Sequence, residues 1–150
     1  MSGTYIQNYC HIIFSTKERQ NLLTTELTKV LYPYISGIIQ HQDSFVYALN
    51  GMPNHLHILC SLPKTISLSK FIQHIKMNSS KWVHENYPEY SHFSWQKGYG
   101  AFSVSPSKKK QVISYIQNQE THHRHKSFQD EFLEFLEAYE IDFDSKYIWK

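Results

Sequence analysis

The sequence predicts an α+β fold, a ferredoxin-like βαββαβ sandwich whose antiparallel sheet carries two helices on one face. Four segments alternate apolar and polar residues as half-buried strands do, and two amphipathic segments with helical spacing lie between them. The order strand, helix, strand, strand, helix, strand is that of the split βαβ topology, in which the first and third strands are central. Two more helical segments follow the last strand, a candidate catalytic helix and a further acidic helix.

The first half of the chain supplies a strand, a helix and a hairpin. Residues 9–16 alternate as a first strand. Thr24 or Thr25 can cap a helix that continues to about residue 41, and Pro33 inside its pattern should kink the helix or shift its boundary. A second strand follows at 44–50, and the pair Asn50-Gly51 is a strong hairpin signal that leads into a third strand at 52–60.

The second half repeats the pattern and then becomes helical. Ser67 opens a helix to about residue 86 with an apolar stripe, and residues 99–105 alternate as a fourth strand. Pro106 suits the first turn of the next helix, which continues to about residue 121. A last amphipathic helix has an acidic outer face, and its apolar residues are Phe128, Phe132, Phe135, Leu136 and Tyr139.

Composition indicates one globular domain. The chain has 150 residues, of which 41% are apolar and 19% are charged. We find neither the run of about 18 apolar residues that a membrane helix needs nor the basic and apolar regions of a signal peptide. Cys10 and Cys60 lie on predicted inward faces of strands and are typical of reduced core residues, which favours a cytoplasmic protein.

The net charge of +2 hides an asymmetry along the chain. Residues 1–125 have a balance of +6, which suits a polyanionic partner, whereas residues 126–150 have a balance of −4. We therefore predict a functional domain at 1–125. We expect the acidic helix and tail at 126–150 to pack on the domain or on a dimer partner.

The third strand contains the most informative motif, His55-Leu56-His57. Side chains alternate along a strand, so the two imidazoles share a face while Leu56 and Ile58 point to the core. Two neighbouring imidazoles can bind a metal ion. The alternative interpretation is that they are polar residues on the solvated face of a half-buried strand.

The helix predicted at 106–121 carries a polar stripe that includes Tyr115 and Gln119. These two residues are four apart, so a hydroxyl and an amide carbonyl project together. If this helix packs across the open face of the sheet, Gln119 becomes a third ligand beside His55 and His57, with Tyr115 one turn away. Otherwise Tyr115 is a boundary residue and Gln119 is solvated.

Three segments together resemble the single-tyrosine transposases of the insertion-sequence 200/605 type, in the histidine–hydrophobic–histidine nuclease superfamily. Residues 52–59 match the metal-binding strand of that family, residues 9–17 resemble its first strand and the basic turn after it, and residues 115–119 match its nucleophile helix. The resemblance covers roughly residues 5–125, in the expected order.

The resemblance implies an enzyme that cuts and rejoins single-stranded DNA. Tyr115 would attack the scissile phosphate to form a 5′-phosphotyrosine, and His55, His57 and Gln119 would hold a divalent cation. The family uses magnesium or manganese, although two imidazoles and an amide would bind zinc or manganese at least as well. His122 could replace Gln119 or contact phosphate.

The resemblance also implies DNA with a hairpin as substrate and a homodimer as the assembly, with the tyrosine helix acting on its own subunit or on the other one. Stacking candidates are Trp82, Trp95 and Tyr99. The candidate phosphate contacts are basic residues of the domain, namely Lys17, Arg19, Lys64, Lys108, Lys109 and Lys110.

Three rival interpretations stay open. A non-catalytic nucleic-acid-binding module would share the fold, but it stacks bases on aromatic residues of the open sheet face, where this chain offers His55 and His57. A metal-free phosphodiesterase needs two histidine motifs, and the sequence has one. A domesticated, repeat-associated relative would still nick single-stranded DNA without moving an element, because mobility depends on the flanking DNA.

Overall fold

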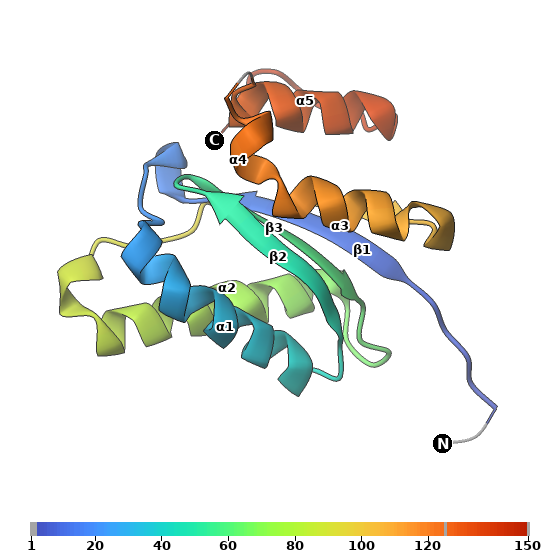
Figure 1. Cartoon of the computed structure of the whole chain (residues 1–150), viewed down its shortest axis with the longest axis horizontal. Helices are drawn as coiled ribbons and strands as arrows, with labels where there is room; N and C mark the ends of the chain where they lie inside the picture. Colours follow the sequence, from blue (N-terminus) through green and yellow to red (C-terminus); the bar gives the residue numbers. More distant parts are fainter. Residues whose placement is uncertain (1–2, 125, 150) are drawn as a thin grey trace.

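The protein is described by a computed structural model, which covers residues 3–124 and 126–149. Its centre is one antiparallel sheet with the strand order β2-β3-β1-β4, so the first and third strands are central as predicted (Figure 1). The strands are β1 (Tyr9–Ser15), β2 (Val46–Met52), β3 (His55–Ser61) and β4 (Gly100–Val104).

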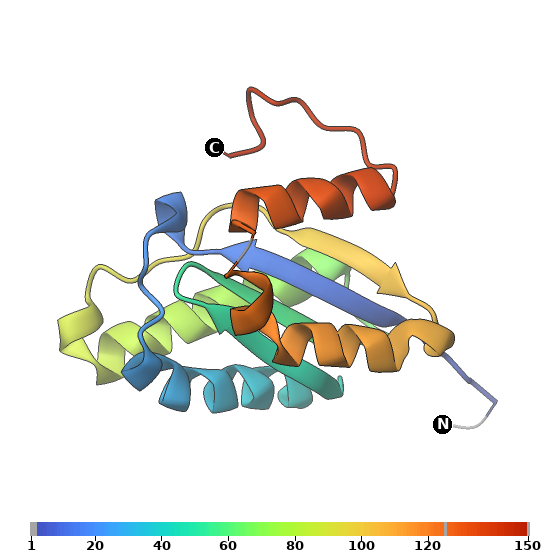
Figure 2. The same ribbon diagram turned by 45° about the horizontal axis from the view of Figure 1, so that its top comes forward.

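Helices cover both faces of this sheet (Figures 1 and 2). One face carries α1 (Thr25–His41) and α2 (Leu68–Asn86). The opposite face carries α3 (Lys109–Gln117), α4 (Gln119–His122) and α5 (Phe128–Ala138). Short 3-10 segments complete the chain at η1 (Lys17–Arg19), η2 (Pro88–Tyr90) and η3 (Pro106–Lys108). The α+β sandwich predicted from the sequence is therefore confirmed.

Side-chain caps explain where the longer helices begin. The hydroxyl of Thr24 accepts a hydrogen bond from the backbone N–H of Leu27, and Ser67 caps α2 in the same way. Ser127 caps α5. Pro33 lies inside α1, which continues through it to His41, so this proline does not shift the helix boundary.

The hairpin turn between β2 and β3 lies further along the chain than the sequence indicated. Asn50 and Gly51 belong to β2, where Gly51 pairs with Leu56, and the turn is made by Pro53 and Asn54. A Cβ at Gly51 would lie 2.2 Å from the carbonyl oxygen of His55. The glycine is thus required by a close approach of two strands and not by a turn.

The helix predicted at 106–121 is interrupted. It begins as η3, continues as α3 and breaks at Asn118, whose φ and ψ of −102° and 29° end the regular backbone before α4 starts at Gln119. Asn118 donates its side-chain amide to the carbonyl of Ser114, which caps the end of α3. Because of this break, Gln119 is the first residue of a separate short helix, α4.

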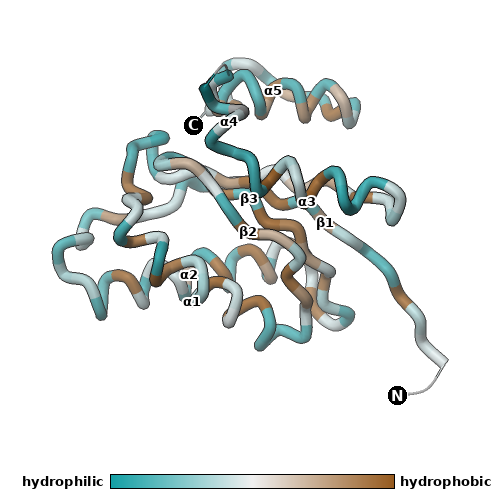
Figure 3. The backbone as a smooth tube through the Cα atoms, viewed as in Figure 1, coloured by the Kyte–Doolittle hydropathy of each residue, from teal (hydrophilic) through white to brown (hydrophobic). Residues whose placement is uncertain are grey.

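Alternation along β3 sends two kinds of side chain to two faces. Leu56, Ile58 and Cys60 belong to the large apolar core formed with α1 and α2. His55 and His57 point to the other side, toward α4 and α5. Figure 3 shows hydrophobic residues along the sheet and a largely hydrophilic α4 above it.

Apolar residues also attach α5 to its face of the sheet. Phe128 and Leu136 are buried with Ile13 and Phe102 of the sheet. The chain after α5 then returns to η1, where the guanidinium of Arg19 lies 5.3 Å from the ring centre of Trp149. Both cysteines are free and buried, and no helix in the described part of the chain is long and apolar enough to cross a membrane.

Candidate active site

His55 and His57 of β3 form the sheet side of a buried cluster of polar side chains. Each has a fully buried side chain, and each uses its Nδ1 within the sheet layer. His57 Nδ1 lies 2.8 Å from Nε2 of His11, and His55 Nδ1 lies 2.8 Å from Oδ1 of Asn54. The Nε2 atoms of both rings consequently face the helices above the sheet.

Gln119 approaches His55 from α4. Its Oε1 lies 3.2 Å from His55 Nε2, and its Nε2 donates to the backbone carbonyl of Tyr115 at 3.3 Å. The second bond fixes which end of the amide faces the histidine. Gln119 is fully buried, so the structure excludes the interpretation that it is solvated.

Glu131 of α5 occupies the centre of the cluster, and the sequence analysis did not predict it. Its Oε1 lies 2.9 Å from His57 Nε2 and 3.6 Å from His55 Nε2. Its Oε2 accepts a hydrogen bond from the hydroxyl of Tyr115 and lies 3.2 Å from Nε2 of His123. One carboxylate therefore joins the histidine pair to the tyrosine.

A sequence signal for Glu131 existed. Phe128 precedes it by three positions and Phe135 follows it by four, so the glutamate lies on the apolar stripe of α5 and not on its acidic outer face. A glutamate in such a position either has a charged or hydrogen-bonding partner or lowers the stability of the fold, because burial of an unpaired charge costs free energy. His123 was also missed, and the side chain of His122, the alternative ligand, lies outside the described residues.

Four of these side chains could hold a metal ion together. The candidate ligand atoms of His55, His57, His123 and Glu131 all lie within 4.8 Å of one another. His123 Nε2 is also 3.1 Å from Oε1 of Gln119, so this histidine contacts both the amide and the carboxylate.

Burial sets the charges in the cluster. Burial, and then repulsion by His57, lowers the pKa of His55 to about 3, and the same two causes lower the pKa of His11 to about 3. Burial opposes ionisation of Glu131, but its hydrogen bonds with His123 and His57 outweigh that effect and lower its pKa. The result is that His55 and His11 are neutral beside an ionised carboxylate. Burial also opposes the charged form of His123, but its hydrogen bond and attraction to Glu131 together outweigh burial and raise the pKa of His123.

Tyr115 is held as a neutral phenol. Burial and then the hydrogen bond to Glu131 raise its pKa well above the ordinary value of 10.0. Its ring centre lies 5.8 Å from that of His57. On its outer side Tyr115 lines a cavity of about 270 Å³ together with Lys126 and Tyr139, so the ring is at the boundary between the cluster and solvent.

The family comparison agrees with the motif order. Residues 4–119 match the family model described as "Transposase IS200 like". The chain belongs to this family. It is thus a member of the IS200/IS605 single-tyrosine transposase family, which confirms the resemblance found in the sequence.

Relatives of this transposase extend over most of the chain. The ISDra2 transposase TnpA of Deinococcus radiodurans is 25% identical over 122 residues, which span 78% of this chain and 87% of the relative. A crystal structure of a transposase from D. radiodurans R1 has a TM-score of 0.62 and 23% identity, covering 79% of this chain and 96% of the other.

A second solved structure is a REP-associated tyrosine transposase bound to a REP hairpin. Its TM-score is 0.61 and its identity 16%, covering 82% of this chain and 74% of the other. At these identities the two solved structures show that the fold is shared.

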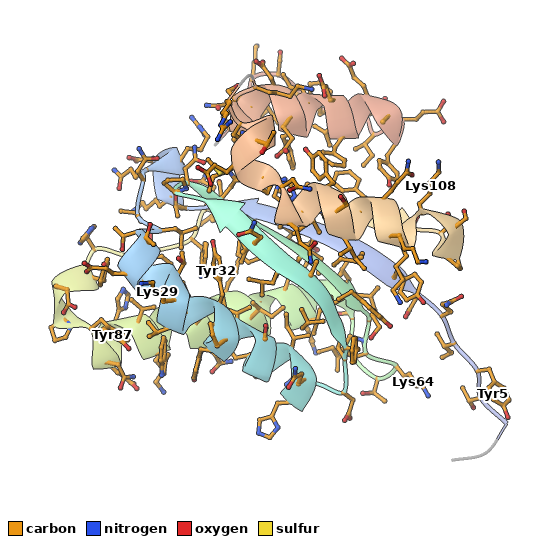
Figure 4. All side chains as sticks on the ribbon, in the orientation of Figure 1. Tyr5, Lys29, Tyr32, Lys64, Tyr87 and Lys108 are labelled. Carbon is orange, nitrogen blue, oxygen red and sulfur yellow. The ribbon has the colours of Figure 1, made fainter. Side chains whose placement is uncertain are left out.

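The predicted DNA contacts of the transposase divide between the two ends of the sheet. Ser15 pairs with His55, so η1 with Lys17 and Arg19 follows β1 at the end where the polar cluster lies. Figure 4 shows Lys64 and Lys108 toward the opposite end, well apart from each other. Lys110 is exposed beyond Lys108, and Lys109 packs over the rings of Tyr9 and Tyr47.

Some of the aromatic residues that were candidates for stacking on bases instead contact other side chains of the protein. Trp82 stacks on Tyr34 with ring centres 4.2 Å apart, and Trp95 donates its indole N–H to Ser79. Trp95 and Tyr99 also line a cavity of about 790 Å³ beside α2. That cavity is on the α1 and α2 side of the sheet, away from the histidine cluster.

Proposed function

We propose that this transposase cuts and rejoins single-stranded DNA, with Tyr115 as the nucleophile and a divalent cation held by His55, His57 and Gln119. The observation that supports this most directly is the convergence of three separate elements. The tyrosine of α3 and His57 of β3 contact one carboxylate, and the glutamine of α4 contacts the neighbouring His55, all within a single chain.

The chemistry of the donor set fits a cation. His55 Nδ1 lies 2.8 Å from Asn54 Oδ1 and His55 Nε2 lies 3.2 Å from Gln119 Oε1, and a neutral ring can donate to only one of these two oxygens. In the tautomer that donates from Nδ1, two buried acceptors face each other, and a cation between them would satisfy both. Magnesium or manganese would be this cation, and either ion would neutralise charge that develops on phosphate oxygens.

The chain's own residues account for the covalent steps. The phenolic oxygen of Tyr115 forms a bond to phosphorus while the bond to the 3′-oxygen breaks, which leaves a 5′-phosphotyrosine and a free 3′-hydroxyl. Glu131, which accepts the hydrogen bond of the Tyr115 hydroxyl, would take up the phenolic proton as the bond to phosphorus forms and would return it to the departing 3′-oxygen. Rejoining reverses the exchange with another 3′-hydroxyl, so no nucleotide cofactor is consumed.

The DNA partner is proposed to contain a hairpin. The REP-associated relative of the same fold was solved with a REP hairpin, which supports this substrate class. That relative also favours the repeat-associated nickase as a second candidate function. The chemistry would not need a second subunit, since every proposed site residue comes from one chain, and the homodimer is a separate prediction that sedimentation of the purified protein tests.

The decisive experiment compares two tyrosine variants. Tyr115→Phe removes the nucleophile, whereas Tyr139→Phe, in the lining of the same cavity, removes a hydroxyl that donates to the backbone carbonyl of Ser103. With single-stranded DNA from the ends of the chain's own locus and manganese, we expect a denaturation-resistant protein–DNA adduct in the wild type and in Tyr139→Phe. Adduct formation by Tyr115→Phe would exclude Tyr115 as the nucleophile.

A further inference from the structure

Glu131 lies outside the ligand set implied by the family motifs, yet it is the most connected side chain of the cluster. It is 2% exposed, and it comes from α5, beyond the residues 4–119 that match the family model. The helix is fixed over the cluster by aromatic contacts, since the ring of Phe128 stacks on His55 at 4.5 Å and Phe135 lies 5.2 Å from the His11 ring. The carboxylate is thus directed into the site by packing.

Two side-chain oxygens approach one histidine nitrogen beside β3, which brings three electron-rich atoms close together. They are the Nε2 of His55, the Oε1 of Gln119 and the Oε1 of Glu131, with spacings of 3.2 Å and 3.6 Å from the histidine nitrogen. The His57 Nε2 lies 2.9 Å from the same carboxylate oxygen. A cation bound between these atoms would interact favourably with all of them, and it would replace the hydrogen bond by which His57 contacts the carboxylate.

The spacings also match coordination geometry. Ligand atoms that are about 2.1 Å from one ion lie about 3.0 Å apart along an octahedral edge and about 3.4 Å apart along a tetrahedral edge. The separations of 2.9, 3.2 and 3.6 Å among the four atoms bracket those values. A carboxylate oxygen would also make the donor set harder than two imidazoles and an amide, which suits magnesium and manganese.

We propose that Glu131 is a fourth protein ligand of the divalent ion, through Oε1, and that its Oε2 holds the Tyr115 hydroxyl next to that ion. The proposal rests on the proposed function, because the ion is the one assigned there to His55, His57 and Gln119. It adds that the metal site is completed by α5 of the same chain. His123, which contacts Gln119 Oε1 and Glu131 Oε2, acts as a positioning residue.

The test is a titration of manganese into the DNA-free protein, followed by calorimetry and by the electron paramagnetic resonance of bound Mn²⁺. Glu131→Gln keeps the size of the side chain and removes the anionic ligand. We expect its Mn²⁺ dissociation constant to rise by at least about tenfold. Glu137→Gln, an exposed glutamate of the same helix, is the matched control and should bind as the wild type does.

Glu131→Asp is a second variant, which distinguishes loss of the metal ligand from loss of metal through misfolding. It keeps the charge on a shorter side chain, and we expect an affinity between those of the wild type and Glu131→Gln, with unchanged circular dichroism for all four proteins. Unchanged affinity in Glu131→Gln would overturn the proposal. Unchanged affinity with faster DNA cleavage would also overturn it, and would identify Glu131 as a group that blocks the scissile phosphate.

The titration contains no DNA, so its outcome is independent of the nucleophile. Adduct formation by Tyr115→Phe would overturn the proposed cleavage mechanism and leave the Glu131 ligand standing. If the wild type forms the adduct normally and Glu131→Gln binds Mn²⁺ as tightly as the wild type, the cleavage mechanism stands and the proposal that Glu131 is a ligand is overturned.

Discussion

The two faces of β3 are equally buried and chemically opposite. Leu56 and Ile58 on one face and His55 and His57 on the other are all 0% exposed. The apolar pair packs in the core with α1 and α2 and contributes to stability through removal of hydrocarbon from water. The histidine pair gains nothing comparable, and its burial is tolerated because each ring nitrogen has a polar partner. Burial by itself therefore does not distinguish the residues that stabilise the fold from those that perform the chemistry.

The largest difference between the two faces should appear in activity. Replacing both His55 and His57 by Ala removes two ligands of the proposed ion, which supplies several kcal/mol to phosphate chemistry, so we expect adduct formation to slow by at least about a thousandfold. The measurement is the manganese-dependent rate of adduct formation, with circular dichroism as the control for folding. If the double variant responds to manganese as the wild type does, the metal ion does not bind at this face of the sheet.

The apolar face should show the opposite behaviour. Leu56→Ala leaves a cavity in the core, and we expect it to lower the free energy of unfolding by about 2–5 kcal/mol. Urea denaturation followed by tryptophan fluorescence measures this loss. The adduct rate per folded molecule should stay that of the wild type, and a cost below about 1 kcal/mol would mean that the core relaxes around the missing atoms.

The apolar face is also the part that the sequence predicted best. Strand and helix periodicities are local, and the caps at Thr24 and Ser67 are formed by the residues that the pattern indicated. The errors were turn details. Gly51 was interpreted as a turn residue because glycine serves both turns and close approaches, and only the pairing with Leu56 distinguishes them.

The polar face was predicted only as far as its motifs extend. His55, His57, Tyr115 and Gln119 follow from local spacing together with a family resemblance, whereas Glu131 depends on where α5 packs, which is a long-range property. Its position between Phe128 and Phe135 could have indicated burial, but not the partner that offsets the buried charge. The division of the chain at residue 125 remains a prediction, and α5 places a side chain in the cluster from beyond it.

Acid should lower the stability of the protein through the buried histidines of the polar face, whereas the hydrocarbon side chains of the apolar face have no group that titrates. Burial, and then repulsion by His57, lowers the pKa of His11 from 6.5 to about 3. Between these values the unfolded chain binds more protons than the folded one, so stability is complete above about pH 6.5 and falls as the pH decreases toward 3. His55 acts in the same direction. Each such proton contributes a slope of up to about 1.4 kcal/mol per pH unit.

Urea denaturation in the presence of a metal chelator, between pH 7.5 and 4.5, measures this slope. His11→Gln removes one of the buried imidazoles, and its stability should depend less steeply on pH than that of the wild type. Leu56→Ala serves as the control, since its stability should be lower at every pH with the slope unchanged. Equal slopes for His11→Gln and the wild type would show that His11 does not titrate in this range.

The smallest effect concerns the strand ends, which neither helical layer covers. Helices close both faces of the sheet, so a DNA backbone should reach the histidines past the end of β1, where η1 presents the exposed Lys17. We expect Lys17→Ala to weaken binding of a short oligonucleotide limited to the cleavage site and to reduce the salt dependence of its affinity by about 0.7, the value for one phosphate of a single strand. Lys108→Ala, at the opposite end, should leave that oligonucleotide unaffected and weaken only a longer substrate that carries the hairpin. Equal losses in both variants with the short oligonucleotide would mean that the two ends of the sheet do not bind separate parts of the DNA.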